Sequence, residues 1–289
     1  MTTPALDYSR QGTLGIRVEL IRQIKRRRTL VAFLLVIALP LIVVAAVKFG
    51  PSSDDGSGGQ GRFGDGDFDL VGLATNGAWN FSVTMLLFAS GFLLIVIAAM
   101  FLGDTVASEA SWSTLRYLLV APVPRRRLLR TKAIVGLILT LTVLLTLVIF
   151  SWLIGAVSFG TEALASPLGG AFSQAESLQR VAIITAYVGL TLLFPAGFAF
   201  LMSVLTDVPL GAVGTAVIVV IVFNILDAIE ALGSLRQLLP TDYGAAWIDA
   251  LSPNIAWSEM ATGAAYNLIA FALLIAIATL RFDRKDIVS

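Results

Sequence analysis

Six long stretches without a charged residue limit the fold of this 289-residue chain more than any other feature. A helix needs about 20 mostly apolar residues to cross a hydrocarbon core of ~30 Å, and each stretch is about that long or longer. A soluble domain would not contain six of them. The sequence therefore predicts an all-α integral membrane protein. The expected spans lie at about 29–47, 79–102, 133–158, 181–204, 208–226 and 260–280.

These spans form one expected six-helix domain over residues 29–289, preceded by a separate N-terminal segment, residues 1–28. A cleaved secretory signal is the alternative for the first span. However, 28 residues precede that span, and its apolar run exceeds the ~7–15 residues typical of a signal. Pro40 and Pro195 fall inside the first and fourth spans, where we expect each to kink its helix.

Basic residues predict how the chain crosses the membrane. Sixteen of the 20 Lys and Arg lie before the first span, between the second and third spans, or after the last. Loops rich in Lys and Arg stay in the cytoplasm. Both termini are therefore expected to be cytoplasmic, as an even number of spans requires, in a multi-pass protein of the cell membrane. The net charge of +1 conceals an inner side near +9 and an outer side near −8.

Composition excludes several classes of function. The chain has no Cys and no His, which removes disulfides, thiolate nucleophiles and the usual zinc ligands. A net charge of +1 argues against nucleic acid as a partner. Neither H-E-x-x-H nor G-x-S-x-G occurs. An integral-membrane enzyme that uses only outer carboxylates stays open as an alternative, although these acids show no paired spacing.

Two segments on the expected outer side differ in character. Residues 48–78 are rich in Gly and Asp, which is typical of a solvated loop. The spacing of Asp65, Asp67 and Asp69 suggests the start of a calcium loop, but the twelfth position is Asn76 rather than Glu. Residues 227–259 mix Leu and Trp with Gly and Pro, which favours short helices at or dipping into the outer interface.

An amphipathic helix is expected before the first span. Its apolar side carries Leu14, Leu20, Val18, Ile21 and Ile24, and its polar side carries Glu19, Arg22, Gln23 and Arg26. This pattern indicates a helix on the inner leaflet, with its cations attracted to anionic membrane lipids. The simpler interpretation is that the cations only set the topology.

The segment between the second and third spans is the most informative. Trp112, Leu115 and Leu119 share one helical face, and prolines then end the helix before a run of arginines. Such a helix is suited to docking in a groove of another protein, and an ordinary cytoplasmic loop is the alternative. The order of Glu109, Thr114-Leu115, Leu118-Leu119, Pro122, Arg125 and Lys132 resembles the same loop in the permeases of type-2 ATP-binding-cassette (ABC) exporters. Ser113 departs from that pattern, where the family usually has Gly.

The resemblance implies a cytoplasmic coupling helix that receives motion from a separate ATPase subunit. Glu109 would face polar groups of that subunit, Leu115 and Leu119 would seat in its groove, and Pro122 with Arg125 would fix the entry into the third span. The implied ATPase-coupling residues are Glu109, Trp112, Thr114, Leu115, Leu119, Pro122 and Arg125. The implied assembly has two permease copies, identical or related, and two ATPase copies, and it exports a hydrophobic or amphipathic substrate such as a drug or lipid.

The chain has no ATP-binding loop of its own. A Walker A loop requires a Gly directly before its Lys, and none of the four lysines follows a Gly. We therefore expect a transporter subunit rather than an enzyme, without a cofactor, while the partner binds ATP and Mg²⁺. A secondary transporter is the main alternative, although the spans carry no charges. Asn224 and Asn267 lie nearest the middle of spans and are expected to bond neighbouring helices.

Overall fold

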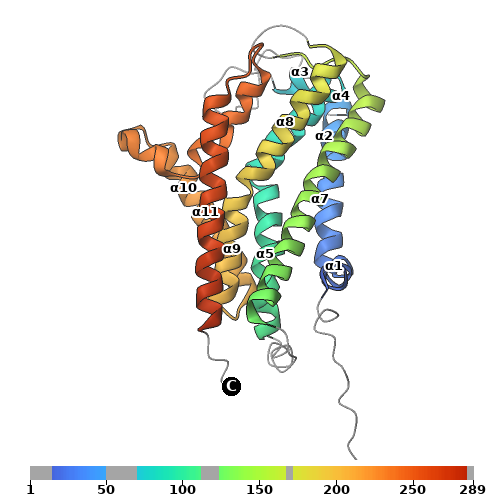
Figure 1. Ribbon diagram of the computed structural model, residues 1–289. Helices are drawn as coiled ribbons and strands as arrows, with labels where there is room; N and C mark the ends of the chain where they lie inside the picture. The colour runs from blue at the N-terminus through green and yellow to red at the C-terminus, as the bar shows by residue number, and fades with distance from the viewer. Residues whose placement is uncertain (1–14, 50–69, 112–123, 167–171, 285–289) are drawn as a thin grey trace, which may run out of the picture.

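The computed structural model describes residues 15–49, 70–111, 124–166 and 172–284, which form a bundle of helices (Figure 1). Six helical segments in these ranges are long and apolar enough to cross a membrane. The prediction of an all-helical, multi-pass membrane protein is confirmed at this level. The six segments are Arg27–Phe49, Leu93–Ser111, Arg125–Phe159, Gln174–Leu205, Pro209–Asp227 and Trp257–Asp283.

The helices follow one another with short connections. The first half of the chain forms α1 (Ile16–Ile24), α2 (Arg27–Phe49), α3 (Leu70–Thr75), α4 (Ala78–Ser90), α5 (Leu93–Ser111) and α7 (Arg125–Phe159). The second half forms α8 (Gln174–Thr191), α9 (Leu193–Leu205), α10 (Pro209–Asp227) and α11 (Trp257–Asp283). Two 3₁₀ helices, η1 (Glu230–Leu238) and η2 (Asp242–Leu251), connect α10 to α11.

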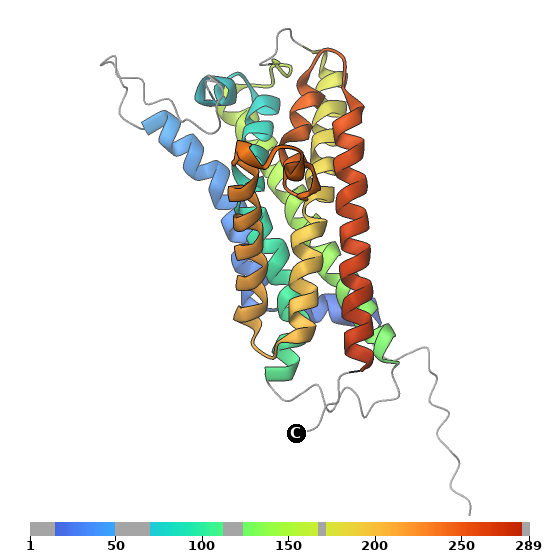
Figure 2. The ribbon, with the colours of Figure 1, turned by 90° about the vertical axis from the view of Figure 1, so that its left-hand side faces the viewer.

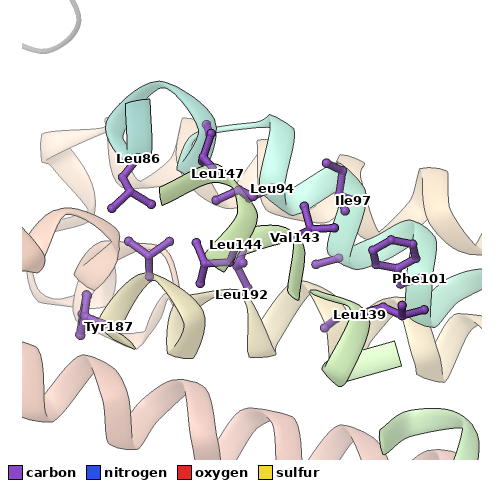
Figure 3. Close-up of a cluster of buried hydrophobic side chains, with 14 of the residues drawn as sticks. Leu86, Leu94, Ile97, Phe101, Leu139, Val143, Leu144, Leu147, Tyr187 and Leu192 are labelled. Carbon is purple, nitrogen blue, oxygen red and sulfur yellow. The ribbon is translucent and has the colours of Figure 1, made fainter. Parts of the chain in front are cut away.

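The core lies where α4, α5, α7 and α8 meet. Leu94, Phe101, Leu144 and Tyr187 are buried there, and Figure 3 shows their side chains interdigitating. A Cβ added at Gly136 would lie 2.9 Å from Cδ1 of Leu102, so the close approach of α7 to α5 requires Gly. By contrast, α2, α10 and α11 expose many Leu and Ile side chains, as lipid-facing helices do.

Two of the predicted spans are broken helices. Residues 79–102 divide into α4 and α5, and the break falls at a Ser-Gly pair, a common cause of sharp kinks. Residues 181–204 divide into α8 and α9 at Leu192. Pro195 explains this second break, because it has no N–H to donate to the carbonyl of Thr191. Pro40 lies within the continuous α2.

The two ends of the bundle differ in charge. At one end α1 lies across the bundle axis, next to the start of α7 (Figure 2). Most of the described basic side chains are here, on α1, the first turn of α2, the start of α7 and the end of α11. We call this end the basic end. The opposite end holds α3, the start of α8 and the η2 helix.

Arg180 ties the segment between α10 and α11 to the bundle at the opposite end. Its guanidinium donates to the carbonyls of Ala250 and Ser252 at 2.5 Å and of Pro253 at 3.0 Å. It also stacks 3.8 Å from the ring centroid of Phe172. In addition, the Tyr187 hydroxyl donates to the carbonyl of Tyr243 at 2.6 Å. Because Tyr187 lies far along α8, the start of η2 sits well inside the bundle.

Candidate functional site

Most of the predicted coupling helix lies outside the described residues. This applies to Trp112, Thr114, Leu115, Leu119 and Pro122, whose roles stay predictions. The structure does describe both borders of the segment. Glu109 lies in the last turn of α5, and Arg125 is the first residue of α7.

A buried ion pair joins the two helices at these borders. Nζ of Lys132 on α7 lies 2.7 Å from Oε1 of Glu109 on α5, and it donates to the carbonyl of Thr105 at 3.0 Å. Lys132 is 1% exposed and Glu109 is 2% exposed. Carboxylates and ammonium groups are this deeply buried only when they are paired. The pair therefore fixes the end of α5 to the start of α7.

The α1 helix completes this pair with charges of its own. Oε1 of Glu19 lies 3.6 Å from Nζ of Lys132, and Arg22 bonds both Glu19 and Glu109. Gln23 donates to Glu19 at 2.8 Å. Two acids and two bases thus balance in one network, which we call the clasp: Glu19, Arg22, Glu109 and Lys132.

The clasp also shifts the titration of Glu19. Burial by itself would raise the pKa of this carboxyl. The attraction of Lys132, the hydrogen bond from Gln23 and the contact with Arg22 outweigh burial, so the pKa is lowered. Glu19 therefore stays ionised inside the protein.

A second group of charges ties the start of α2 to α5. Asp104 on α5 accepts from Nη1 of Arg26 at 2.9 Å and also contacts Arg28. Arg28 in turn donates to Oε1 of Gln23 at 2.7 Å, so this group connects to the clasp. The helices α1, α2, α5 and α7 are therefore joined by polar contacts at the basic end.

The orientation of α1 follows from this network. Its polar side faces the bundle, with Glu19 and Gln23 buried. Its apolar side faces outward, where Val18 is 66% exposed and Ile24 is 51% exposed. The sequence predicted the two sides of this helix. The structure adds that the protein covers the polar side and leaves the apolar side to the surroundings.

The two described coupling residues take different places. Glu109 was expected to face a partner, but the structure places its carboxylate within the chain, against Lys132 and Arg22. Arg125 donates to the carbonyls of Phe282 at 3.4 Å and Asp283 at 3.2 Å, at the end of α11. A cation at the C-terminal end of a helix is favourable. Arg125 thus links the start of α7 to α11.

An apolar groove of ≈ 950 Å³ runs between α7 and α8. Leu141, Leu145, Leu178 and Leu190 line it together with neighbouring apolar side chains. The rings of Trp79 and Trp152, whose centroids are 5.5 Å apart, lie at one end. A groove with this lining can accept apolar groups but offers few polar contacts.

A second, more polar pocket of ≈ 280 Å³ lies where the two helix breaks meet. Ser90 and Gly91 come from the first break, and Thr191 and Leu192 come from the second. Asp227, at the end of α10, and Asp242, at the start of η2, also line it. Burial and the nearby Asp227 raise the pKa of Asp242.

Sequence reasoning missed this pocket. It grouped Asp227 and Asp242 with the outer acids that show no paired spacing, and it expected a kink at Pro195 but no break within residues 79–102. The available signals were the Ser-Gly pair at residues 90–91 and Pro195 inside otherwise apolar runs. Breaks of this kind in membrane helices are typical of sites that bind ligands or ions.

Comparison with known proteins identifies a family without assigning an activity. The chain matches no curated protein. Residues 61–288 match the profile of the family described as "Protein of unknown function (DUF2705)". The match covers every described helix from α3 to α11, and with it the polar pocket, the groove and both borders of the predicted coupling segment. The chain belongs to this family of proteins of unknown function.

Proposed function

We propose that the chain is the membrane-spanning permease subunit of an ATP-driven exporter of the type-2 ABC class. The resemblance of residues 109–132 to the coupling loop of that class motivates the proposal. The observation that carries it is the clasp, because Glu109 and Lys132 bracket the predicted coupling segment with a buried ion pair.

The clasp gives the coupling segment a mechanical connection to the bundle. Removing one partner of a buried ion pair costs about 3–5 kcal/mol, so the ends of α5 and α7 move together rather than apart. The α5 helix packs most extensively against α9, and Ser203 on α9 accepts from the backbone N–H groups of Val106 and Ala107 at 3.0 Å. A force applied to residues 112–123 would therefore reach the middle of the bundle.

In this proposal the basic end faces the cytoplasm. Positive charge on that side agrees with the positive-inside rule, and it places both chain termini and the coupling segment where ATP is found. The outward apolar side of α1 would then lie in the inner leaflet. The polar side of α1 would carry movement of the coupling segment to α2 through Arg26 and Asp104.

The apolar groove supports a hydrophobic or amphipathic substrate. It is lined mainly by Leu, Val, Ile and Trp, and it runs between two helices that could move apart. A second permease copy would complete the translocation path. ATP and Mg²⁺ would bind only to the two separate ATPase subunits.

Cysteine crosslinking tests the proposal, because the chain has no Cys of its own. The permease would be co-expressed with a candidate ABC ATPase subunit, and a Cys at Leu115 would be crosslinked to single Cys residues in the ATPase groove. Val157, which is 89% exposed near the other end of α7, supplies the control position. We expect crosslinks from position 115 and none from 157. An intact complex without crosslinks from 115 contradicts the proposal.

A secondary transporter is the second candidate, and the polar pocket is the observation that favours it. Broken helices and acidic side chains are typical of ion-coupled transport sites. Transport by the purified chain in vesicles, driven by a proton gradient without ATP or an ATPase, would support this candidate instead.

A further inference from the structure

The polar pocket between the helix breaks is built from elements far apart in the sequence. Besides the two breaks, α10 contributes Asn224 and Asp227, the start of η2 contributes Asp242, and α11 contributes Asn267. Figure 2 shows that α10 ends below the tops of α8 and α11. The pocket therefore lies partway along the bundle and is partly open to the surroundings, because its lining residues Asn224, Gly244 and Ala245 are exposed.

The charges around the pocket are mainly negative. Asp242 lies near Asp227 and Glu259, whose negative charges act on it. Arg236 supplies the positive charge, with Nε 3.3 Å from Oδ1 of Asp227. Asp227 is also the last residue of α10, where the helix dipole is negative. With Asp227 and Asp242 both ionised, one base against three acids leaves an excess of negative charge.

Two buried oxygen atoms point to a ligand that donates hydrogen bonds. Asn267 is 1% exposed, and its Nδ2 donates to the carbonyl of Gly263 at 2.9 Å. Because Nδ2 is the donor in this bond, the acceptor atom of the amide, Oδ1, is left over. It has no hydrogen-bond partner within the described part of the chain. Oγ1 of Thr241, also a pocket residue, is likewise buried without a partner there. Buried polar atoms are normally satisfied, so these acceptors call for a donor.

The remaining walls of the pocket are apolar. Ile95, Phe194 and Val220 line one side, and the ring of Phe194 stacks on Phe223 at 5.7 Å. A bare metal ion would leave this surface unused. The volume of ≈ 280 Å³ is just below the about 300–1,000 Å³ of sites for drug-sized ligands, which indicates a smaller organic molecule.

We propose that this pocket binds a small organic cation, with its ammonium group between Asp227 and Asp242 and its apolar body against Ile95, Phe194 and Val220. Oδ1 of Asn267 and Oγ1 of Thr241 accept hydrogen bonds from the ammonium group. The inference concerns binding alone, so it holds whether the chain is coupled to an ATPase or to an ion gradient.

Binding would also release a proton. Without ligand, burial and the negative charge of the nearby Asp227 raise the pKa of Asp242, so this carboxyl keeps its proton to higher pH. An ammonium ion that enters between the two side chains favours the ionised form, and the proton leaves to solvent. The titratable groups around Asp242 are Asp227 on α10, Arg236 on η1, Tyr187 on α8, its neighbour Tyr243, and Glu259 and Tyr266 on α11. Affinity is therefore expected to rise with pH as the pair loses its proton.

Equilibrium binding to the purified full-length chain in lipid nanodiscs tests the inference. The probe is phenethylammonium, and 2-phenylethanol, which has the same apolar body without the charge, is the matched neutral compound. A sodium chloride titration tests whether an inorganic cation is the ligand. We expect saturable binding of phenethylammonium, binding of the alcohol weaker by about tenfold or more, and no competition by sodium beyond that of another salt.

Three variants locate the binding. Asp242→Asn keeps the ion pair between Asp227 and Arg236, and Asn267→Ala removes the unpartnered oxygen. Each is expected to weaken phenethylammonium binding about tenfold or more, whereas Glu230→Gln, an exposed acid on η1 outside the pocket, leaves it unchanged. Equal binding of the neutral alcohol, binding of sodium alone, or unchanged affinity in folded Asp242→Asn and Asn267→Ala would each overturn the inference. Size-exclusion profiles establish which variants are folded.

Discussion

Nζ of Lys132 lies 2.7 Å from Oε1 of Glu109, and both side chains are almost completely buried at the borders of the predicted coupling segment. No other described pair joins α5 and α7 by such deeply buried opposite charges. The pair depends on α1, because Glu19 and Arg22 supply the charges that balance it. The N-terminal helix is therefore part of this site.

Removing one charge of the Glu109–Lys132 ion pair is expected to destabilise the protein. Lys132→Met leaves the carboxylates of Glu109 and Glu19 with one cation, Arg22, in a buried position. The expected loss in the free energy of unfolding is about 3–5 kcal/mol. The double variant Lys132→Met with Glu109→Gln is expected to lose less than the sum of the two single variants. Additive losses in a double-mutant cycle, measured by unfolding in mixed micelles, would contradict a direct interaction.

The outward side of α1 is expected to contact lipid. A spin label on Val18→Cys should be more accessible to oxygen than to a water-soluble nickel reagent, because oxygen concentrates in the bilayer. A label on Lys25→Cys, just past the end of α1, should show the opposite preference. Electron paramagnetic resonance on the chain in vesicles measures both. The same ratio of oxygen to nickel accessibility at the two positions would show that α1 does not lie in the membrane interface.

A methyl group added at Gly136, where α7 packs closely against α5, is expected to destabilise the protein. Gly136→Ala places a Cβ 2.9 Å from both Cγ and Cδ1 of Leu102, so the Leu102 side chain or the two helices must shift. Overpacking of this kind costs about 1–3 kcal/mol of stability. Gly214→Ala on α10 is the control, because nothing lies within 4 Å of its added Cβ. Thermal unfolding should separate the two variants, and equal midpoints would contradict the predicted packing.

The spans could be predicted because length and hydropathy alone identify a membrane helix. The break at Gly91 was not predicted. Pro195 predicted a kink in the fourth span but could not show that the helix breaks there, since an apolar run with a Pro also occurs as a continuous helix, as Pro40 in α2 shows. Periodicity identified the two sides of α1. It could not show which side the protein covers, because that depends on the buried charges of Glu109 and Lys132.

The sequence could not show which residues pair within the clasp or within the polar pocket, because these residues are far apart along the chain. Glu109 was assigned to an external partner by the resemblance to exporter permeases, and nothing local to it in the sequence carries a matching charge. Its cation, Lys132, reaches it only through the antiparallel packing of α5 and α7. Asp227 and Asp242 likewise come together only because the chain folds back between the end of α10 and the start of η2. The prediction for residues 112–122 stands on the resemblance alone.

The raised pKa of Asp242 predicts how stability depends on pH without ligand. The unfolded chain protonates this group near its ordinary pKa of 3.8, whereas the folded chain protonates it at higher pH. Its contribution to stability is therefore complete below the unfolded value and is lost as pH rises through the folded value. Asp242→Asn, which stays uncharged, should keep that stability at neutral pH, so the variant should unfold at a higher temperature than the wild type at pH 7. The two midpoints should converge toward pH 4, and a variant less stable than the wild type at pH 7 would show that ionised Asp242 stabilises the fold.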